Sequence, residues 1–256
     1  MSEPRRLTML VHGDSGTGKS WLLDTAPGPR LLLDAEHRYQ YTPSNKIVWD
    51  PHTAVPDLGP DDTAVVLVRS FNDIELAYNV LASGDHPFKS VLIDSLTEAQ
   101  QRLMDNVAGI HQPDLQDWGE IARKLSHEIR RFKDLRTHPK NPLWAVVVAA
   151  GSIKDETSGE WEVLLNGQMK DRSIYHFDVV GFLTWERDPL TGATSRLLQI
   201  TPAGRTRAKA KDNTDFLFKE YGHEIEIGDN GPGITDFLKV LNPEPTTSKE
   251  EETVNG

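Results

Sequence analysis

Short apolar runs alternate along the first 150 residues with segments whose apolar residues recur at helical spacing. The strand-length runs lie at 7–12, 31–33, 47–49, 64–69, 90–94 and 143–150, and the helical pattern occupies 19–25, 72–83, 97–107 and 114–137. The run at 143–150 is apolar throughout, as expected of a central strand covered on both faces. This alternation predicts an α/β domain, with a mainly parallel twisted sheet flanked by helices.

The pattern changes after residue 151. Segments 177–186 and 195–201 flank the turn residues of 188–192 and predict a β-hairpin. A short strand at 224–227 and a last helix at 234–241 follow, while 152–176 has the composition of a long loop. We expect one domain over residues 1–241. Residues 242–256 are rich in Pro, Thr and Glu, which predicts a disordered acidic tail.

Composition narrows the functional classes. No segment approaches the roughly 18 apolar residues of a membrane span, and the polar N-terminus does not resemble a signal peptide, so we expect a cytoplasmic protein without a membrane partner. The chain has no cysteine, which excludes disulfides, thiol nucleophiles and cysteine-based zinc sites. Its net charge of −11 argues against a broad basic surface for duplex DNA, although a local basic loop is compatible with it.

The clearest motif follows the first predicted strand. It matches G-x-x-x-x-G-K-[ST] and consists of Gly13, Asp14, Ser15, Gly16, Thr17, Gly18, Lys19 and Ser20. Glycines let the backbone N–H groups turn toward phosphates, the lysine reaches the β- and γ-phosphates, and the serine hydroxyl binds Mg²⁺. A chance match in a Gly-rich turn is the alternative, but a strand before the loop and a helix after it favour an ATP-Mg²⁺ site.

Two acidic residues end other predicted strands. Asp94 follows the apolar run Ser90-Val-Leu-Ile and is the candidate second magnesium ligand, unless it merely caps the next helix. Glu36 follows Leu31–Leu33 and is a candidate for the base that orients and deprotonates the attacking water. An ordinary acid at a strand end is the alternative for Glu36.

These segments resemble RecA-type recombinases. Leu33-Asp-Ala-Glu-His37 is similar to the strand end that carries their catalytic glutamate, and Leu92-Ile-Asp-Ser-Leu96 to their Walker B segment. Lys209-Ala-Lys211, followed by Phe216, resembles the element with which RecA protomers reach a neighbour's ATP. The resemblance covers roughly residues 7–227. In its lack of extra domains the chain is similar to phage RecA-like ATPases, including those of the Sak single-strand annealing group.

The resemblance implies a RecA-like P-loop fold, Glu36 as the water-activating base, and self-association with ATP at the subunit interface. It also implies that Lys209 and Lys211 act in trans on the transferring phosphoryl group, although a basic strand edge explains the pair equally well. One feature departs from the family. RecA proteins place a polar sensor, usually glutamine, after the central strand, and only Ser152 stands nearby here.

In RecA-like folds single-stranded DNA passes the loops that correspond to 109–117 and 152–176. The second segment mixes cationic and aromatic residues able to bind phosphates and stack on bases: Lys154, Trp161, Lys170 and Arg172. Five acidic residues in the same segment work against DNA binding. An ordinary flexible loop is the alternative.

The leading interpretation is an ATP-hydrolysing RecA-like protein that acts on single-stranded DNA in phage recombination or strand annealing. A single-strand-binding protein would be a further partner, and the host cytoplasm the location. Two other classes stay open: a partner-gated ATPase such as a helicase loader, and a small-molecule P-loop kinase. Stimulation of ATP hydrolysis by single-stranded DNA would separate the first class from both others.

Overall fold

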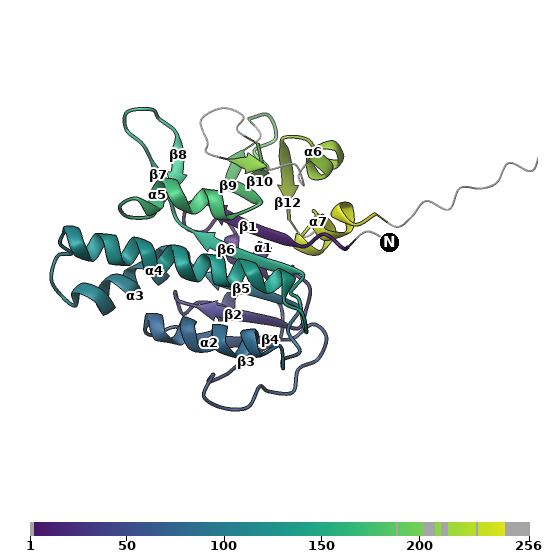
Figure 1. Ribbon diagram of the computed structural model, residues 1–256. Coiled ribbons are helices and arrows are strands. Elements are labelled where there is room, and N and C mark those ends of the chain that lie inside the picture. The colour runs from purple at the N-terminus through teal and green to yellow at the C-terminus, as the bar shows by residue number, and fades with distance from the viewer. Residues whose placement is uncertain (1–2, 188, 202–207, 211–214, 229, 244–256) are drawn as a thin grey trace, which may run out of the picture.

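The protein is described from a computed structural model, which covers residues 3–187, 189–201, 208–210, 215–228 and 230–243. The described strands form one ten-stranded sheet in the order β12-β10-β9-β1-β6-β5-β2-β4-β3, with β11 paired to β9 (Figure 1). A separate two-stranded sheet consists of β7 and β8. The predicted mainly parallel sheet with flanking helices and an antiparallel hairpin toward the C-terminus is confirmed.

Parallel strands make up most of the large sheet. They are β1 (Leu7–His12), β2 (Arg30–Asp34), β3 (Lys46–Val48), β4 (Thr63–Leu67), β5 (Ser90–Asp94), β6 (Ala145–Ala150) and β9 (Val179–Arg187). The strands β10 (Thr194–Gln199), β11 (Lys209–Ala210) and β12 (Glu224–Ile227) run antiparallel to their neighbours. Asp34 and Asp94 are register partners across β2 and β5. Parallel pairing therefore places the carboxyl ends of the central strands at one edge, where ligands bind in such sheets.

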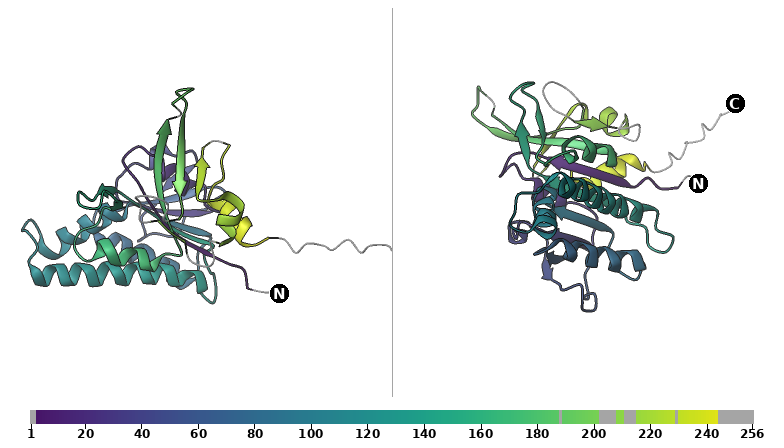
Figure 2. Two further views of the ribbon diagram at one scale, coloured as in Figure 1. Left: turned by 90° about the horizontal axis from the view of Figure 1, so that it is seen from above. Right: turned by 60° about the vertical axis from the view of Figure 1, so that its left-hand side comes forward.

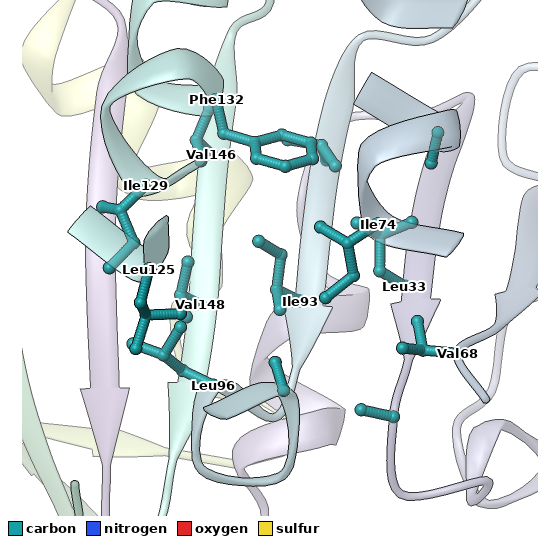
Figure 3. Close-up of a cluster of buried hydrophobic side chains, with 14 of the residues drawn as sticks. Leu33, Val68, Ile74, Ile93, Leu96, Leu125, Ile129, Phe132, Val146 and Val148 are labelled. Carbon is teal, nitrogen blue, oxygen red and sulfur yellow. The ribbon is translucent and has the colours of Figure 1, made fainter. Parts of the chain in front are cut away.

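Helices cover both faces of the sheet because alternate residues along each strand point to opposite sides. One face carries α2 (Phe71–Ser83), α3 (Leu96–Ala108) and α4 (Leu115–Asp134), whose apolar residues pack on Leu33, Ile93 and Val146 (Figure 3). The other face carries α1 (Lys19–Asp24) and α7 (Ile234–Leu241), which pack on Met9 and Leu32. The apolar side chains of the protein therefore form two clusters, one on each face of the sheet.

The β9–β10 hairpin extends beyond the rest of the sheet (Figure 2, left). It is nevertheless anchored in the sheet, because the first half of β9 pairs in parallel with β1 from Met9↔Val179 to His12↔Phe182. The sequence predicted the hairpin but not the strand with which it pairs. Pairing with the strand that precedes the P-loop makes it a direct neighbour of the predicted nucleotide site.

The segment 152–176, for which a flexible loop was one of the two alternatives, contains regular elements. It contains β7 (Ser152–Lys154), β8 (Trp161–Val163), α5 (Met169–Arg172) and the 3₁₀ helix η3 (Ser173–His176). Met169 is fully buried against the core, and the Ser126 hydroxyl contacts its sulfur at 3.2 Å. The helix α6 (Asp215–Tyr221) and the 3₁₀ helix η1 (Tyr39–Tyr41) were also not predicted, whereas the 3₁₀ helix η2 (Leu135–Thr137) falls within the helix predicted at 114–137.

Other boundaries agree closely with the sequence prediction. The last helix has the predicted ends, Ile234–Leu241, and most other elements differ from the prediction by one to three residues. The proposed tail falls at 242–256, of which 244–256 lie outside the described residues. Among the helices of the described ranges, none combines the length and the apolar character needed to cross a bilayer.

Candidate nucleotide site

The P-loop connects the end of β1 to the start of α1, and each of its three glycines meets a separate requirement. Gly16 and Gly18 have φ angles of 80° and 97°, which side chains other than glycine rarely adopt. At Gly13 a Cβ atom would lie 2.2 Å from the carbonyl oxygen of Leu183 on β9, so only glycine allows this approach. The loop conformation is therefore encoded both by local dihedral angles and by packing against the hairpin.

Lys19 lies at the start of α1 with its ammonium group turned toward the loop. Its Nζ donates hydrogen bonds to the carbonyl oxygens of Gly13 and Asp14, both at 2.8 Å. Burial lowers the pKa of Lys19, and the nearby carboxylates of Asp94 and Glu36 oppose that shift. A partly desolvated ammonium at this position is suited to interact strongly with a polyphosphate.

Ser20 and Asp94 meet directly. The Ser20 hydroxyl donates a hydrogen bond to Oδ2 of Asp94, although the two residues come from α1 and β5. The alternative of a helix cap does not apply to Asp94, because the hydroxyl of Ser95 accepts from the Glu98 N–H at the start of α3. Burial raises the pKa of Asp94 to about 6, and the Glu36 and Asp34 charges act in the same direction.

Asp34 ends β2 and Glu36 follows it by two residues, but the two carboxylates have different surroundings. The Asp34 carboxylate accepts a hydrogen bond from the Tyr39 N–H at 2.9 Å and so holds the turn after β2. Glu36 lines a cavity together with the P-loop, and its carboxylate lies 3.5 Å from the guanidinium of Arg38. Its backbone N–H donates to the carbonyl oxygen of Asp94 at 3.3 Å. The ends of β2 and β5 are thereby fastened to each other.

The cavity has a volume of about 490 Å³ and brings together most residues of the predicted nucleotide site. All P-loop residues except Thr17 line it, along with Glu36 and Asp94. The structure adds residues that sequence reasoning missed: Trp21, Arg38, Tyr41, Thr97, Leu164 and Arg196. Arg38 stands two residues after Glu36 and could have been suspected, whereas no sequence signal connects Arg196 to a loop so far away in the chain.

Ser152 also lines this cavity, in the region where the sequence offered no other polar sensor. Its hydroxyl lies 2.8 Å from Nδ1 of His12, the last residue of β1. His12 is fully buried, and desolvation lowers its pKa to about 3, so the imidazole is neutral. Phe182 packs against His12 with ring centroids 5.2 Å apart, and Trp161 stacks on Phe182 at 5.7 Å.

The four residues tentatively assigned to DNA have unlike surroundings. Lys154 is exposed on β7 opposite Trp161, whose ring stacks on Phe182. Lys170 forms ion pairs with Glu162 and Asp155, so acidic neighbours offset its charge. Arg172 is exposed and belongs to another part of the surface.

Arg172 lines a second cavity, of about 440 Å³, between α4 and the segment from α5 to η3. We call it the basic groove. Arg123 and Arg130 from α4 line it as well, seven positions and therefore two helical turns apart. The remaining lining residues are Gly119, Ala122, Ser126, Gln168, Tyr175 and His176, so no acidic side chain of the described chain belongs to it.

Of the two lysines expected to act in trans, one lies within the residues that the structure describes and the other does not. Lys209 begins β11, which pairs with β9 at Lys209↔Val180. Lys211 lies outside the described residues. The nearby Phe216 packs on the apolar cluster under α1 and α7, and the Arg5 guanidinium lies 4.1 Å from its ring centre.

A family model described as an AAA domain matches residues 5–211, a segment that contains the P-loop, Glu36 and Asp94. The comparison with curated proteins finds no match. Among solved structures, the chain is similar to a KaiC-like protein of the hyperthermophilic archaeon Pyrococcus horikoshii OT3, with 14% identity and a TM-score of 0.43. That similarity covers 88% of this chain and 87% of the other.

Proposed function

This chain belongs to the AAA domain family and is a P-loop ATPase, and from that premise we propose that its ATP cycle is coupled to single-stranded DNA. Strand annealing or recombination is the process in which we place it, in keeping with its resemblance to phage RecA-like ATPases. The basic groove is the observation that supports binding of single-stranded DNA, because it gives an acidic protein a local surface for phosphates.

The residues of the cavity fit a nucleotide bound with Mg²⁺. Lys19 supplies a positive charge to the β- and γ-phosphates, while Ser20 and Asp94 together present hydroxyl and carboxylate oxygens, the donors that Mg²⁺ prefers. A magnesium ion bound there would neutralise charge on the phosphates. Glu36, at the cavity wall, orients the attacking water and accepts its proton. Asp94 must be ionised to bind Mg²⁺. Because its pKa is raised, Mg²⁺ binding should weaken at mildly acidic pH.

The basic groove fits the sugar–phosphate backbone of a single strand. Arg123 and Arg130 project from one side of α4, and Arg172 comes from the facing helix α5. Guanidinium groups bind phosphates through paired N–H donors. Tyr175 also lines the groove and is 66% exposed, and bases of single strands stack on aromatic side chains at such surfaces.

The test measures ATP hydrolysis with and without single-stranded DNA. Wild type should be stimulated, and both Lys19→Ala and Glu36→Gln should abolish turnover. The Arg123→Glu/Arg130→Glu double variant should keep its basal rate and lose the stimulation. Lys124→Glu is the matched control, because Lys124 lies on the same helix but pairs with Glu120 at 2.7 Å. It should be stimulated like wild type.

The outcomes separate the proposals. Stimulation that persists in the double variant would place DNA elsewhere on the protein without removing the DNA-coupled function. ATP turnover that is indifferent to DNA in wild type would overturn that function and favour a partner-gated ATPase. Phosphate transfer to a metabolite would instead identify a small-molecule kinase.

A further inference from the structure

Arg196, on β10, lies against the P-loop from the side of the projecting hairpin. A Cβ atom placed on Gly18 would lie 3.1 Å from its Nε and 3.3 Å from its Cζ, so the guanidinium is in contact with the loop. Arg196 lines the nucleotide cavity together with Lys19. The hairpin therefore brings a second cation to the loop that binds phosphate.

Two tryptophans hold the Arg196 side chain in place. Trp185 is its register partner across β9 and β10, and the guanidinium carbon lies 4.7 Å from the Trp185 ring centre. The guanidinium carbon also lies 5.9 Å from the ring centre of Trp21, the residue after Ser20. Trp185 also donates a hydrogen bond from Nε1 to the carbonyl oxygen of Gly16 at 3.2 Å. The hairpin is thus fastened to the loop and carries an oriented guanidinium.

The charge of Arg196 has no acidic partner in the part of the chain that the structure describes. Its described interactions are with the two indole rings, and its Nε is buried without a hydrogen-bond acceptor. A guanidinium has five N–H donors in a planar fork suited to phosphate oxygens. An arginine in these surroundings, at the wall of a polyphosphate cavity, is placed to bind an anion.

The sheet order indicates which part of the nucleotide Arg196 would meet. Glu36 follows β2 and Asp94 ends β5, both on one side of β1, whereas β10 lies on the other side. If the γ-phosphate faces Glu36, the α-phosphate end must face the hairpin. Arg196 also lines a further cavity of about 680 Å³, between β10, β12 and the loop before α7. This space is large enough for the nucleoside.

We propose that Arg196 binds the α- and β-phosphates of the nucleotide held by its own subunit, with Trp21 and Trp185 fixing its guanidinium. The nucleoside then occupies the 680 Å³ cavity beyond it. This inference rests on the nucleotide site proposed above. It adds a phosphate-binding cation that acts in cis, in contrast to the action in trans that the family resemblance implies for Lys209 and Lys211.

The first test compares binding of ATP, ADP and inorganic tripolyphosphate to the full chain. Arg196→Ala should weaken all three by about ten- to hundredfold, the range of a lost hydrogen bond to a charged group. Arg196→Lys should recover part of the loss, since it keeps the charge without the planar fork. Arg187→Ala, at the exposed end of β9, is the matched control and should bind like wild type.

Lys19→Ala distinguishes a failure of the role given to Arg196 from a failure of the nucleotide site itself. If Lys19→Ala abolishes tripolyphosphate binding while Arg196→Ala and Arg196→Lys bind it like wild type, the role of Arg196 is overturned and the nucleotide site stands. If Lys19→Ala also binds tripolyphosphate like wild type, the nucleotide site itself is misplaced and the inference falls with it. Far-UV circular dichroism and thermal melting of each variant show whether a loss reflects unfolding, and a folded Arg196→Lys keeps the test decisive.

A second test determines whether Arg196 acts within its own subunit. Arg196→Ala and Lys19→Ala proteins are mixed at several ratios, and ATP hydrolysis is measured. For action in cis, the rate of each mixture should equal the sum of its two components. A rate above that sum would mean that the Arg196 of a Lys19→Ala subunit completes a neighbour's site, which would overturn the proposal.

Discussion

Among single residues, Asp94 shows a conflict between stability and function. Its carboxylate is 7% exposed, and burial raises its pKa to about 6 from an ordinary value of 3.8. The folded protein therefore binds this proton more tightly than the unfolded chain does. The ionised form needed to hold a cation is the form that the fold disfavours.

The first prediction concerns Asp94→Asn in nucleotide-free protein with a chelator. In wild type, the contribution of Asp94 to the free energy of unfolding should fall as pH rises from about 4 to 6. Above pH 6 this contribution should stay constant at its lower value. Asparagine does not titrate and can still accept from Ser20. The variant should thus be more stable than wild type at pH 8, by up to about 3 kcal/mol, and this advantage should vanish at pH 4.

Urea unfolding at both pH values measures the difference, and ATP hydrolysis should be lost in the variant. Lower stability of Asp94→Asn than of wild type at pH 8 would contradict the interpretation, because the buried charge would then not be a cost.

His12 gives the opposite pH dependence. Its pKa is lowered from 6.5 to about 3 by burial, with a smaller effect of Lys19, so the folded state disfavours the imidazolium. Its stabilising contribution is complete above pH 6.5 and declines as pH falls toward 3, by at most about 1.4 kcal/mol per pH unit. His12→Asn retains a polar group opposite Ser152 without titrating. The pH slope of its unfolding free energy between 6.5 and 4.5 should be flatter, and identical slopes would refute this account.

Among the elements, α4 shows how one helix serves both the core and a surface. Its N-terminus is closed by a capping box, in which the Asp114 carboxylate accepts from Asp117 N–H and the Asp117 carboxylate accepts from Asp114 N–H. Leu125, Ile129 and Phe132 pack against the sheet (Figure 3). The opposite side supplies Arg123 and Arg130 to the basic groove. The helix thereby fixes the groove relative to the core.

Two leucines of α4 make a matched pair for testing this packing. Leu125 is 1% exposed, and Leu125→Ala should destabilise the protein by about 2–5 kcal/mol through the cavity it leaves. Leu115, at the first position of the same helix, is 90% exposed, and Leu115→Ala should leave the unfolding free energy almost unchanged. Chemical denaturation compares them. Equal effects would mean that the helix is not packed as described.

At the scale of the whole molecule, charge is distributed unevenly. The chain carries a net charge of −11, yet three arginines gather in the basic groove. Binding of an anionic strand to such a protein must depend on that local surface, and mobile ions should screen it efficiently.

We therefore expect the binding of single-stranded DNA to weaken strongly as the salt concentration rises. With three phosphate contacts, the logarithm of the binding constant should fall with the logarithm of salt concentration with a slope of about −2. Fluorescence polarisation of a labelled single strand between roughly 50 and 200 mM salt gives the slope. Arg123→Glu/Arg130→Glu should bind weakly and show a shallower slope, whereas an unchanged slope would exclude the groove.

The sequence by itself determined the features that depend on neighbouring residues. The glycines of the P-loop, the apolar run before Asp94 and the alternation of strands and helices are local patterns, because backbone dihedral angles and side-chain periodicity act over a few residues. These patterns placed Lys19, Ser20, Glu36 and Asp94 at the ends of their elements, and the structure brings all four to one cavity.

Only the tertiary structure decided which distant residues surround that cavity and which charges remain available. Arg196 reaches Gly18 because β10 follows β9 and β9 pairs with β1, an order that no spacing in the sequence reveals. From the sequence, Lys170 and Arg172 were equal candidates for binding phosphate. In the folded protein Lys170 forms an ion pair with Glu162, whereas Arg172 lines the basic groove with two arginines of α4. Electrostatic partners are set by proximity in space, and proximity between distant segments is a property of the sheet order and the packing of helices on it.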